Sequence, residues 1–193
     1  LTRSQLERQA WSQVASAQAA TQSLLAAEQE RLADQLGLFS ERPTLQQLTR
    51  SQTADELHRY LQDFQNQSGL DILLLCTVDG LLLAGDGDFT SCPTAENQGV
   101  ELLDGRPAIL AQQVVVDQQT ERPLGTAVAG VWLESQVLQY LSAATGTQQS
   151  IVQVDGRRLS SNFATTGTMA PITAVSSLPT GEAGGQVLTL HED

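Results

Sequence analysis

The sequence has no lysine and very little histidine. All 10 basic residues are arginine, and 22 acidic residues outnumber them, so the formal net charge is -12. Such a charge repels a phosphate backbone, which argues against nucleic-acid binding. Neither histidine, His58 or His191, stands in a motif with a nucleophile or a carboxylate, so the sequence predicts no catalytic residue and no enzyme.

Cysteine is also scarce, since only Cys76 and Cys92 occur. Two cysteines cannot build a disulfide framework, and a structural zinc site needs four ligands. The sequence therefore predicts no metal and no cofactor. It favours two separate thiols, with Cys76 buried as a small hydrophobic residue. A disulfide between the two is the alternative, and it would require an oxidising compartment.

Long apolar runs are absent too. No segment reaches the about 20 apolar residues of a transmembrane helix, and no leader peptide is recognisable. The chain starts inside a helical pattern at Leu1 and stops after "QVLTLHED". This is typical of an excised piece, whose native flanks we expect to be transmembrane helices.

Helix-forming residues dominate the first third of the chain. Residues 2–36 contain neither glycine nor proline and predict one long helix that Gly37 ends. At about 1.5 Å per residue it would reach roughly 50 Å, longer than a compact domain of this size needs. We therefore expect part of it to project or to pair with a second copy. A helix that lies along its own sheet over its whole length is the alternative. Shorter helices follow over residues 44–68, and Gly69 is the natural end of the last one.

After residue 69 the hydrophobic pattern becomes strand-like. "LDILLLCT" and "LLLAG" flank an Asp-Gly hairpin turn, and "PAILAQQVVVD" and "GTAVAGVWLE" predict two more strands. A short helix, a second Asp-Gly hairpin and a strand "GQVLTL" complete the order. Residues 86–106 lack a period and predict a long loop of the kind that is usually functional or mobile. Strands joined by hairpins, with helices set apart, indicate an α+β fold with an antiparallel sheet.

The segment "L..YL..F...SGLDILLLCTVDGLLLA", followed by "DGRPAILAQQVVVD....RPLGTAVAGVWLE..VLQYLSAATG", resembles the Cache domains. These are extracytoplasmic PAS-like sensors, related to the CHASE-type sensors of bacterial signalling proteins. The resemblance covers about residues 50–162. It implies a PAS-like sheet with helices on one face and a loop that roofs a pocket. The implied organisation is a single sensor domain over residues 1–193, with a long helix (1–37), short helices (44–68) and a sheet region (69–193).

Three charged residues are candidates for ligand contacts. Asp86 and Asp88 could offer carboxylate oxygens to a divalent cation, although an ordinary polar hairpin end, which commonly has this composition, is the favoured alternative. Arg106 stands where pockets of the resembled family often hold an anion-binding residue, and a guanidinium suits a carboxylate ligand. A surface ion pair with Asp104 or Glu101 is the favoured alternative. The Arg, Trp, Tyr and Asp set with which many Cache domains bind amino acids is not found, so amino-acid sensing is not implied.

Three residues of the central strands are the other candidates. Trp132 shares a strand face with small residues, which would leave room for a ligand, although core packing is the favoured alternative. Gln112 and Gln113 are adjacent, so one points to each face of the sheet. A buried glutamine needs hydrogen-bond partners, which a pocket or an exposed edge would supply.

The sequence thus predicts a non-catalytic, extracytoplasmic input domain of a membrane histidine kinase, cyclase or chemoreceptor. It would sense an unidentified small molecule and form a homodimer through the N-terminal helix. One alternative is a dimerisation spacer that keeps the PAS-like fold but has no ligand. A more remote alternative is a small hydrolase.

Overall fold

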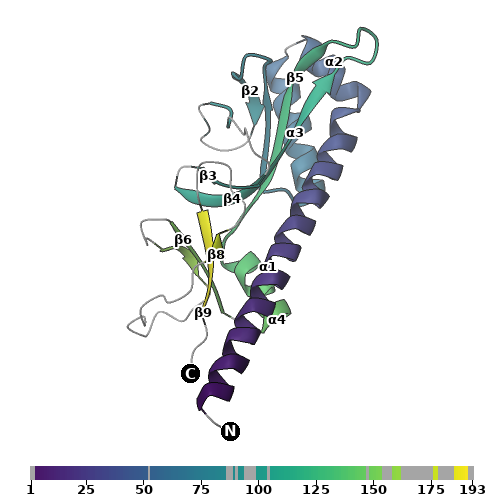
Figure 1. The fold of residues 1–193 in the computed structure, drawn as a ribbon. Coiled ribbons are helices and arrows are strands. Elements are labelled where there is room, and N and C mark those ends of the chain that lie inside the picture. Colours follow the sequence, from purple (N-terminus) through teal and green to yellow (C-terminus); the bar gives the residue numbers. More distant parts are fainter. Residues whose placement is uncertain are drawn as a thin grey trace. The chain divides into compact units, whose positions relative to one another are not determined.

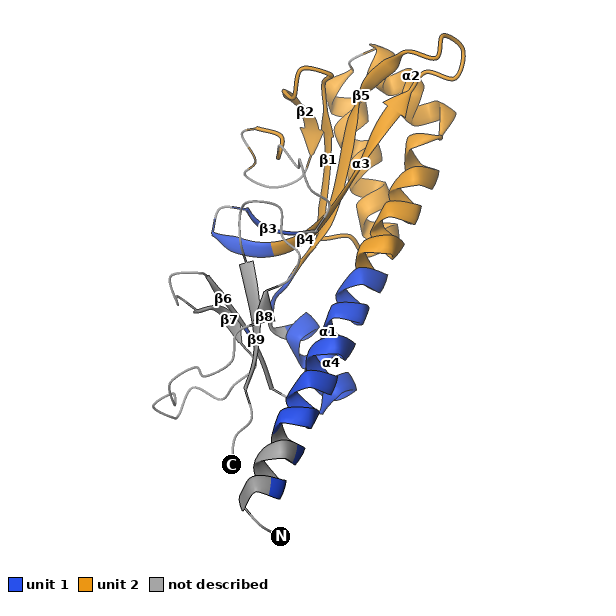
Figure 2. Cartoon of the chain, in the orientation of Figure 1, with its two compact units in different colours: residues 1–27, 100–107, 133–193 blue, residues 28–99, 108–132 orange. Residues whose placement is uncertain are grey.

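The computed structural model shows an α+β protein with a long N-terminal helix and an antiparallel sheet, as predicted (Figure 1). The described residues are 3–51, 53–85, 89, 91–93, 99–103, 105–146, 148–153, 158–161, 176–177 and 185–190. The chain divides into two compact units (Figure 2). Unit 1 comprises residues 1–27, 100–107 and 133–193, and unit 2 comprises residues 28–99 and 108–132. That the whole chain is one sensor domain stays a prediction.

Helix α1 (Arg3–Ser40) runs through the glycine that was expected to end it. Gly37 has no atom within 4 Å of where a Cβ would stand and no positive φ, so it is an ordinary helical residue. The helix continues because Phe39, in its last turn, is fully buried and its ring contacts those of Tyr60 and Phe64. Burial of an aromatic ring outweighs the modest helix penalty of one glycine.

Helices α2 (Pro43–Ser51) and α3 (Ala54–Ser68) follow in unit 2. Proline is well suited to the first turn of a helix, because its missing N–H would have no partner there. Gly69 ends α3 in the left-handed conformation, with φ at 69°, as predicted. Helix α2 packs against β5, α3 packs against β1 and β2, and Figure 2 shows both helices on one side of the sheet.

The first sheet has five strands in the order β2-β1-β5-β4-β3. Their bounds are β1 (Ile72–Cys76), β2 (Leu82–Gly85), β3 (Gly99–Leu103), β4 (Arg106–Val116) and β5 (Pro123–Trp132). All five residues of β1 are buried, which confirms the central strand that its apolar run predicts. Strand β3 was not expected, since its residues were assigned to the long loop. The Asp-Gly pair at 104–105 is the sequence signal that could have predicted a hairpin turn between β3 and β4. Gly105 has a φ of 78°.

Unit 1 contains helix α4 and a second, four-stranded sheet in the order β7-β6-β9-β8. The elements are α4 (Ser135–Thr145), β6 (Gln148–Gln153), β7 (Arg158–Ser161), β8 (Ser176–Ser177) and β9 (Gly185–Leu190). Gly146 ends α4 with a φ of 69°, as predicted. The sequence indicates the strands that form β6, β7 and β9 but not their separation into a sheet of their own. Among the described helices, none combines the length and hydrophobicity of a membrane span.

Candidate functional site

The pairing register of unit 2 places a defined set of side chains on one face of the first sheet. Leu74 lies opposite Val128, and Gln112 also lies opposite Val128, so even-numbered residues of the three strands share a face. We call this the roofed face. It consists of Ile72, Leu74 and Cys76 of β1, Thr126, Val128, Gly130 and Trp132 of β5, and Ala108, Leu110, Gln112 and Val114 of β4.

A segment between β2 and β3 is joined to this face, and we call its described residues (Phe89, Ser91, Cys92 and Pro93) the roof segment. Cys92 forms a disulfide with Cys76 of β1, with 6.1 Å between their Cα atoms. The interpretation of two separate thiols is therefore wrong, although Cys76 is buried as expected, with 2% of its surface exposed. The alternative, a disulfide between the two cysteines, is the arrangement formed. Sequence reasoning did not favour it because the pairing depends on where the long connection returns to the sheet.

Two further contacts join the roof segment to the other two strands. The Gln112 side chain of β4 donates a hydrogen bond from Nε2 to the carbonyl oxygen of Pro93, at 3.1 Å. The rings of Phe89 and Trp132, at the end of β5, stack with centroids 6.5 Å apart and planes 7° from parallel. The roof segment is thus attached to β1, β4 and β5 at one point each.

The floor beneath is apolar and closely packed. Leu74, Leu110 and Val128 expose at most 1% of their surfaces. A Cβ on Gly130 would stand 2.5 Å from Cδ2 of Leu110 and 3.3 Å from Cδ1 of Ile72. The room that small residues beside Trp132 were expected to leave is therefore occupied at Gly130 by neighbouring side chains.

The structure brings together only some of the predicted site residues. Trp132 and Gln112 both contact the roof segment, whereas the adjacent Gln113 is exposed on the opposite face. Asp86 and Asp88 lie outside the described residues. Sequence reasoning anticipated a loop over residues 86–106 but did not select Phe89 and Cys92, the residues of that loop that contact the roofed face.

Arg106 belongs to unit 1, where it is half-exposed and forms an ion pair with Glu134. A surface ion pair was the favoured alternative to a ligand contact, but Glu134 was not the expected partner. That Arg106 contacts a ligand stays a prediction.

Two carboxyl groups among the described residues have shifted pKa values. The backbone N–H of Gln119, the hydroxyl of Thr120 and the guanidinium of Arg50 all bind the Asp117 carboxylate and lower its pKa. Burial has the opposite effect on Glu101 of β3 and raises its pKa. Asp117 follows β4 at the turn into β5, where it fixes the turn rather than a ligand site.

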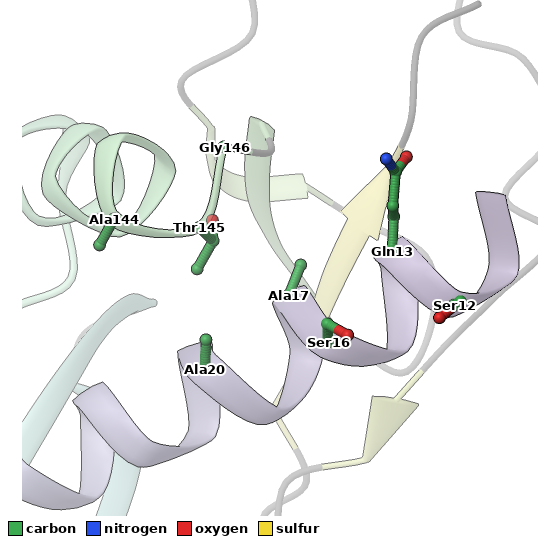
Figure 3. Close-up of a pocket in the computed structure, with 8 residues that line it drawn as sticks. All are labelled: Ser12, Gln13, Ser16, Ala17, Ala20, Ala144, Thr145 and Gly146. Carbon is green, nitrogen blue, oxygen red and sulfur yellow. The ribbon is translucent and has the colours of Figure 1, made fainter. Parts of the chain in front are cut away.

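Unit 1 has a cavity of its own, of about 560 Å³, between α1 and the end of α4 (Figure 3). Its lining residues are Ser12, Gln13, Ser16, Ala17, Ala20, Ala144, Thr145 and Gly146. These offer hydroxyl and amide groups but no ionisable side chain. The cavity can accept a neutral molecule or another side chain, and it has no acid or base for catalysis.

Catalytic and metal-binding groupings are not found in the part of the chain that the structure describes. His58 is exposed on α3, and no group of three or more His, Cys, Asp or Glu residues there could hold a metal ion.

No protein-family model matches the sequence, and no curated protein is significantly similar to it. Among solved structures, the periplasmic domain of LuxQ from Vibrio cholerae is similar with a TM-score of 0.69 and 13% identity, over 93% of this chain and 100% of that chain. The sensor domain of the V. cholerae histidine kinase DctB gives a TM-score of 0.59 and 14% identity, over 87% and 73%. The sensory domain of the Campylobacter jejuni chemoreceptor Tlp3, with isoleucine bound, gives 0.54 and 10%, over 97% and 92%.

All three neighbours are extracytoplasmic sensor domains with PAS-like, Cache-type folds. At 14% identity or less, the likeness concerns the fold. The Cache-like architecture that the sequence resemblance implies is thereby confirmed.

Proposed function

We propose that this chain is the extracytoplasmic, ligand-sensing input domain of a membrane histidine kinase, cyclase or chemoreceptor, with no catalytic activity of its own. One observation carries the proposal. The fold agrees over nearly the whole chain with all of the LuxQ periplasmic domain, and it recurs in a kinase sensor domain and a chemoreceptor domain.

The disulfide supports an oxidising compartment, because bonded cysteines persist in the periplasm or outside the cell and are rare in the cytosol. Cys76 and Cys92 are the only two cysteines of the chain, and they are paired with each other. An extracytoplasmic location and a membrane-anchored parent protein are thus consistent with the cysteine chemistry as well as with the fold.

The ligand site that we propose is the roofed face together with the roof segment. Gln112 offers an amide and Trp132 an aromatic ring beside an otherwise apolar floor, the combination that small-molecule sites commonly use. The Tlp3 domain of the same fold has isoleucine bound. We therefore expect a small organic molecule with an apolar part and a group that hydrogen-bonds an amide.

We further propose that the N-terminal part of α1 pairs with a second copy. Trp11 exposes 56% of its surface on that part of the helix, and an exposed tryptophan is a common centre of a protein interface. Tethering to a membrane would supply the effective concentration that a weak helix pair needs.

A structural spacer with the same fold is the second candidate, and one observation favours it. The space above Gly130 is filled by Leu110 and Ile72, so that part of the roofed face is already packed without a ligand.

A thermal-shift screen of the domain against amino acids, organic acids, sugars and divalent cations separates the two candidates. A compound that binds only the folded state, at 100 times its Kd, adds about 2.7 kcal/mol and raises Tm by about 5–10 °C. The sensing proposal expects at least one such compound. The rise in Tm that this compound causes should shrink in Gln112→Ala. It should persist in Gln113→Ala, because the side chain of Gln113 faces away from the roof segment. If no compound of any class raised Tm, the structural spacer would be favoured.

A further inference from the structure

The described residues of the roof segment make one covalent contact with the sheet and two weaker contacts. The Gln112 side chain donates one neutral hydrogen bond to Pro93, and Phe89 stacks on Trp132 at a half-exposed position. Each is the kind of contact that water competes with effectively. Among these three contacts, the Cys76–Cys92 disulfide is the strongest and holds Cys92 on β1.

The two sulfurs differ in accessibility. Cys76 exposes 2% of its surface on a strand that is paired on both sides, by β2 and by β5. Cys92 is half-buried in the roof segment. An attacking thiolate therefore reaches the sulfur of Cys92, forms a mixed disulfide with it, and displaces Cys76 as the leaving thiolate.

A second thiol of the reductant then attacks the mixed disulfide and releases Cys92. Overall, two low-molecular-weight thiols are oxidised to one disulfide, and two electrons and two protons convert the Cys76–Cys92 bond to two thiols. Cys76 remains packed among leucines after the bond breaks, because β1 keeps its neighbours on both sides. The bond thus holds a surface segment on the sheet without holding the sheet together.

We propose that the Cys76–Cys92 disulfide is a redox-controlled latch on the roofed face. When it is oxidised, the roof segment stays against Cys76 of β1, Gln112 of β4 and Trp132 of β5. When thiols reduce it, Phe89 leaves Trp132 and Pro93 leaves Gln112, so these two side chains of the roofed face become more accessible to solvent while the sheet stays folded. This inference rests on the proposed function in one respect: if the roofed face binds a ligand, the thiol redox state is a second input to the same site.

Trp132 is a built-in reporter of the latch. The chain has two tryptophans, and Trp11 is exposed, so Trp11→Phe leaves Trp132 as the only one. Quenching of its fluorescence by acrylamide would be measured with and without dithiothreitol. Far-UV circular dichroism would report the fold, and thiol titration without denaturant would report reduction. The matched variant is Trp11→Phe with Cys92→Ser, which lacks the bond but keeps Cys76 in the core.

The expected result is a quenching constant that rises by a factor of about two or more on reduction, with the circular dichroism unchanged. The Cys92→Ser variant should show the raised value already and should not respond to dithiothreitol. Three results would each overturn the latch: no thiols appear at millimolar dithiothreitol, quenching is the same in both redox states, or secondary structure is lost on reduction.

The test needs no ligand, so it is independent of the proposed function. Running the thermal-shift screen with oxidised and with reduced protein tests the latch and the sensing proposal together. A compound whose effect on Tm differs between the oxidised and the reduced protein supports both proposals. If no compound shifts Tm in either state but the quenching changes on reduction, sensing of small molecules fails and the latch stands.

Discussion

At the scale of single residues, Gly130 shows how tightly the roofed face is packed. A Cβ there would stand 2.8 Å from the carbonyl oxygen of Ile109, which is backbone and cannot rotate away. Glycine is thus required at position 130 because the backbone of β4 comes too close for a Cβ. A turn is not the reason, since Gly130 has no positive φ.

We predict that Gly130→Ala lowers the free energy of unfolding by about 1–3 kcal/mol, through overpacking. The matched control is Gly37→Ala in α1, where a Cβ would meet nothing within 4 Å. That substitution should raise the stability by about 0.4–1 kcal/mol, because alanine restricts the unfolded chain and favours the helix. Urea unfolding measures both. An alanine at 130 that costs nothing would mean that the face has unfilled space.

The carboxylate of Asp117 should make stability depend on pH. Its folded pKa is lowered, first by the hydrogen bond from Gln119 and also by Thr120 and Arg50. The folded state therefore gains from the ionised form above the ordinary pKa of about 3.9. This stabilisation is lost as pH falls through the lowered folded pKa.

We predict that Asp117→Asn lowers Tm at neutral pH and that its difference from the wild type shrinks below about pH 4. Glu101→Gln should behave oppositely. Burial raises the Glu101 pKa, so its charge is unfavourable at neutral pH, and the substitution should raise Tm there. That gain should fade as pH drops through the raised folded pKa to below the ordinary value of about 4.3. Melting curves from pH 7 to pH 3 check both, and parallel profiles for the variants and the wild type would contradict the assignment.

At the scale of elements, the end of α1 is held to α3 by a cluster of aromatic rings. Phe39 is fully buried, with its ring centroid 4.3 Å from that of Phe64 and 5.9 Å from that of Tyr60. The guanidinium of Arg42 lies 4.8 Å above the Phe64 ring, a cation–π contact on the same cluster. These contacts explain why the helix continues past Gly37.

We predict that Phe39→Ala costs about 3–5 kcal/mol of stability by leaving a cavity between α1 and α3. Its neighbour Leu38 exposes 70% of its surface on the same turn, and Leu38→Ala should change stability by no more than about 0.5 kcal/mol. Thermal unfolding of the two variants side by side makes the comparison. Equal effects would show that the last turn of α1 is not docked on α3.

The elements that could be predicted are those fixed by local chemistry. Gly69 and Gly146 end their helices as expected, and the Asp-Gly turn at 79–80 joins β1 to β2, with Gly80 at a φ of 80°. Long-range pairing was harder to predict. The disulfide joins residues 16 apart through a connection without periodicity, and the separation of β6, β7 and β9 into a second sheet depends on tertiary packing that no local pattern encodes.

The candidate site was predicted in part, for a related reason. Alternation along a strand predicts that Trp132 shares a face with Val128 and that Gln112 and Gln113 point to opposite faces. The pairing register, which the sequence does not give, shows that Gln112 is the glutamine on the face of Trp132. Their contacts with Pro93 and Phe89 depend on the path of the roof segment. Strand residues of a binding face can thus be inferred from sequence, whereas the loop residues that cover it cannot.

At the scale of the whole molecule, each unit contributes a feature suited to signalling. Unit 2 has the roofed face, and unit 1 has the exposed Trp11 and the cavity beside α4. Helix α1 contributes residues to both units. A ligand that favours one packing of a shared helix over another shifts the population between two arrangements. The sensing proposal therefore requires binding to unit 2 to alter the dynamics of α1.

Amide hydrogen exchange, with and without a compound that raises Tm, tests this most directly. The account predicts slower exchange in β1, β4 and β5 and in residues 89–93, together with a changed exchange rate in the part of α1 that belongs to unit 1. Protection confined to the residues around the unit 1 cavity, or no difference anywhere in unit 2, would contradict the assignment of the roofed face as the sensing site.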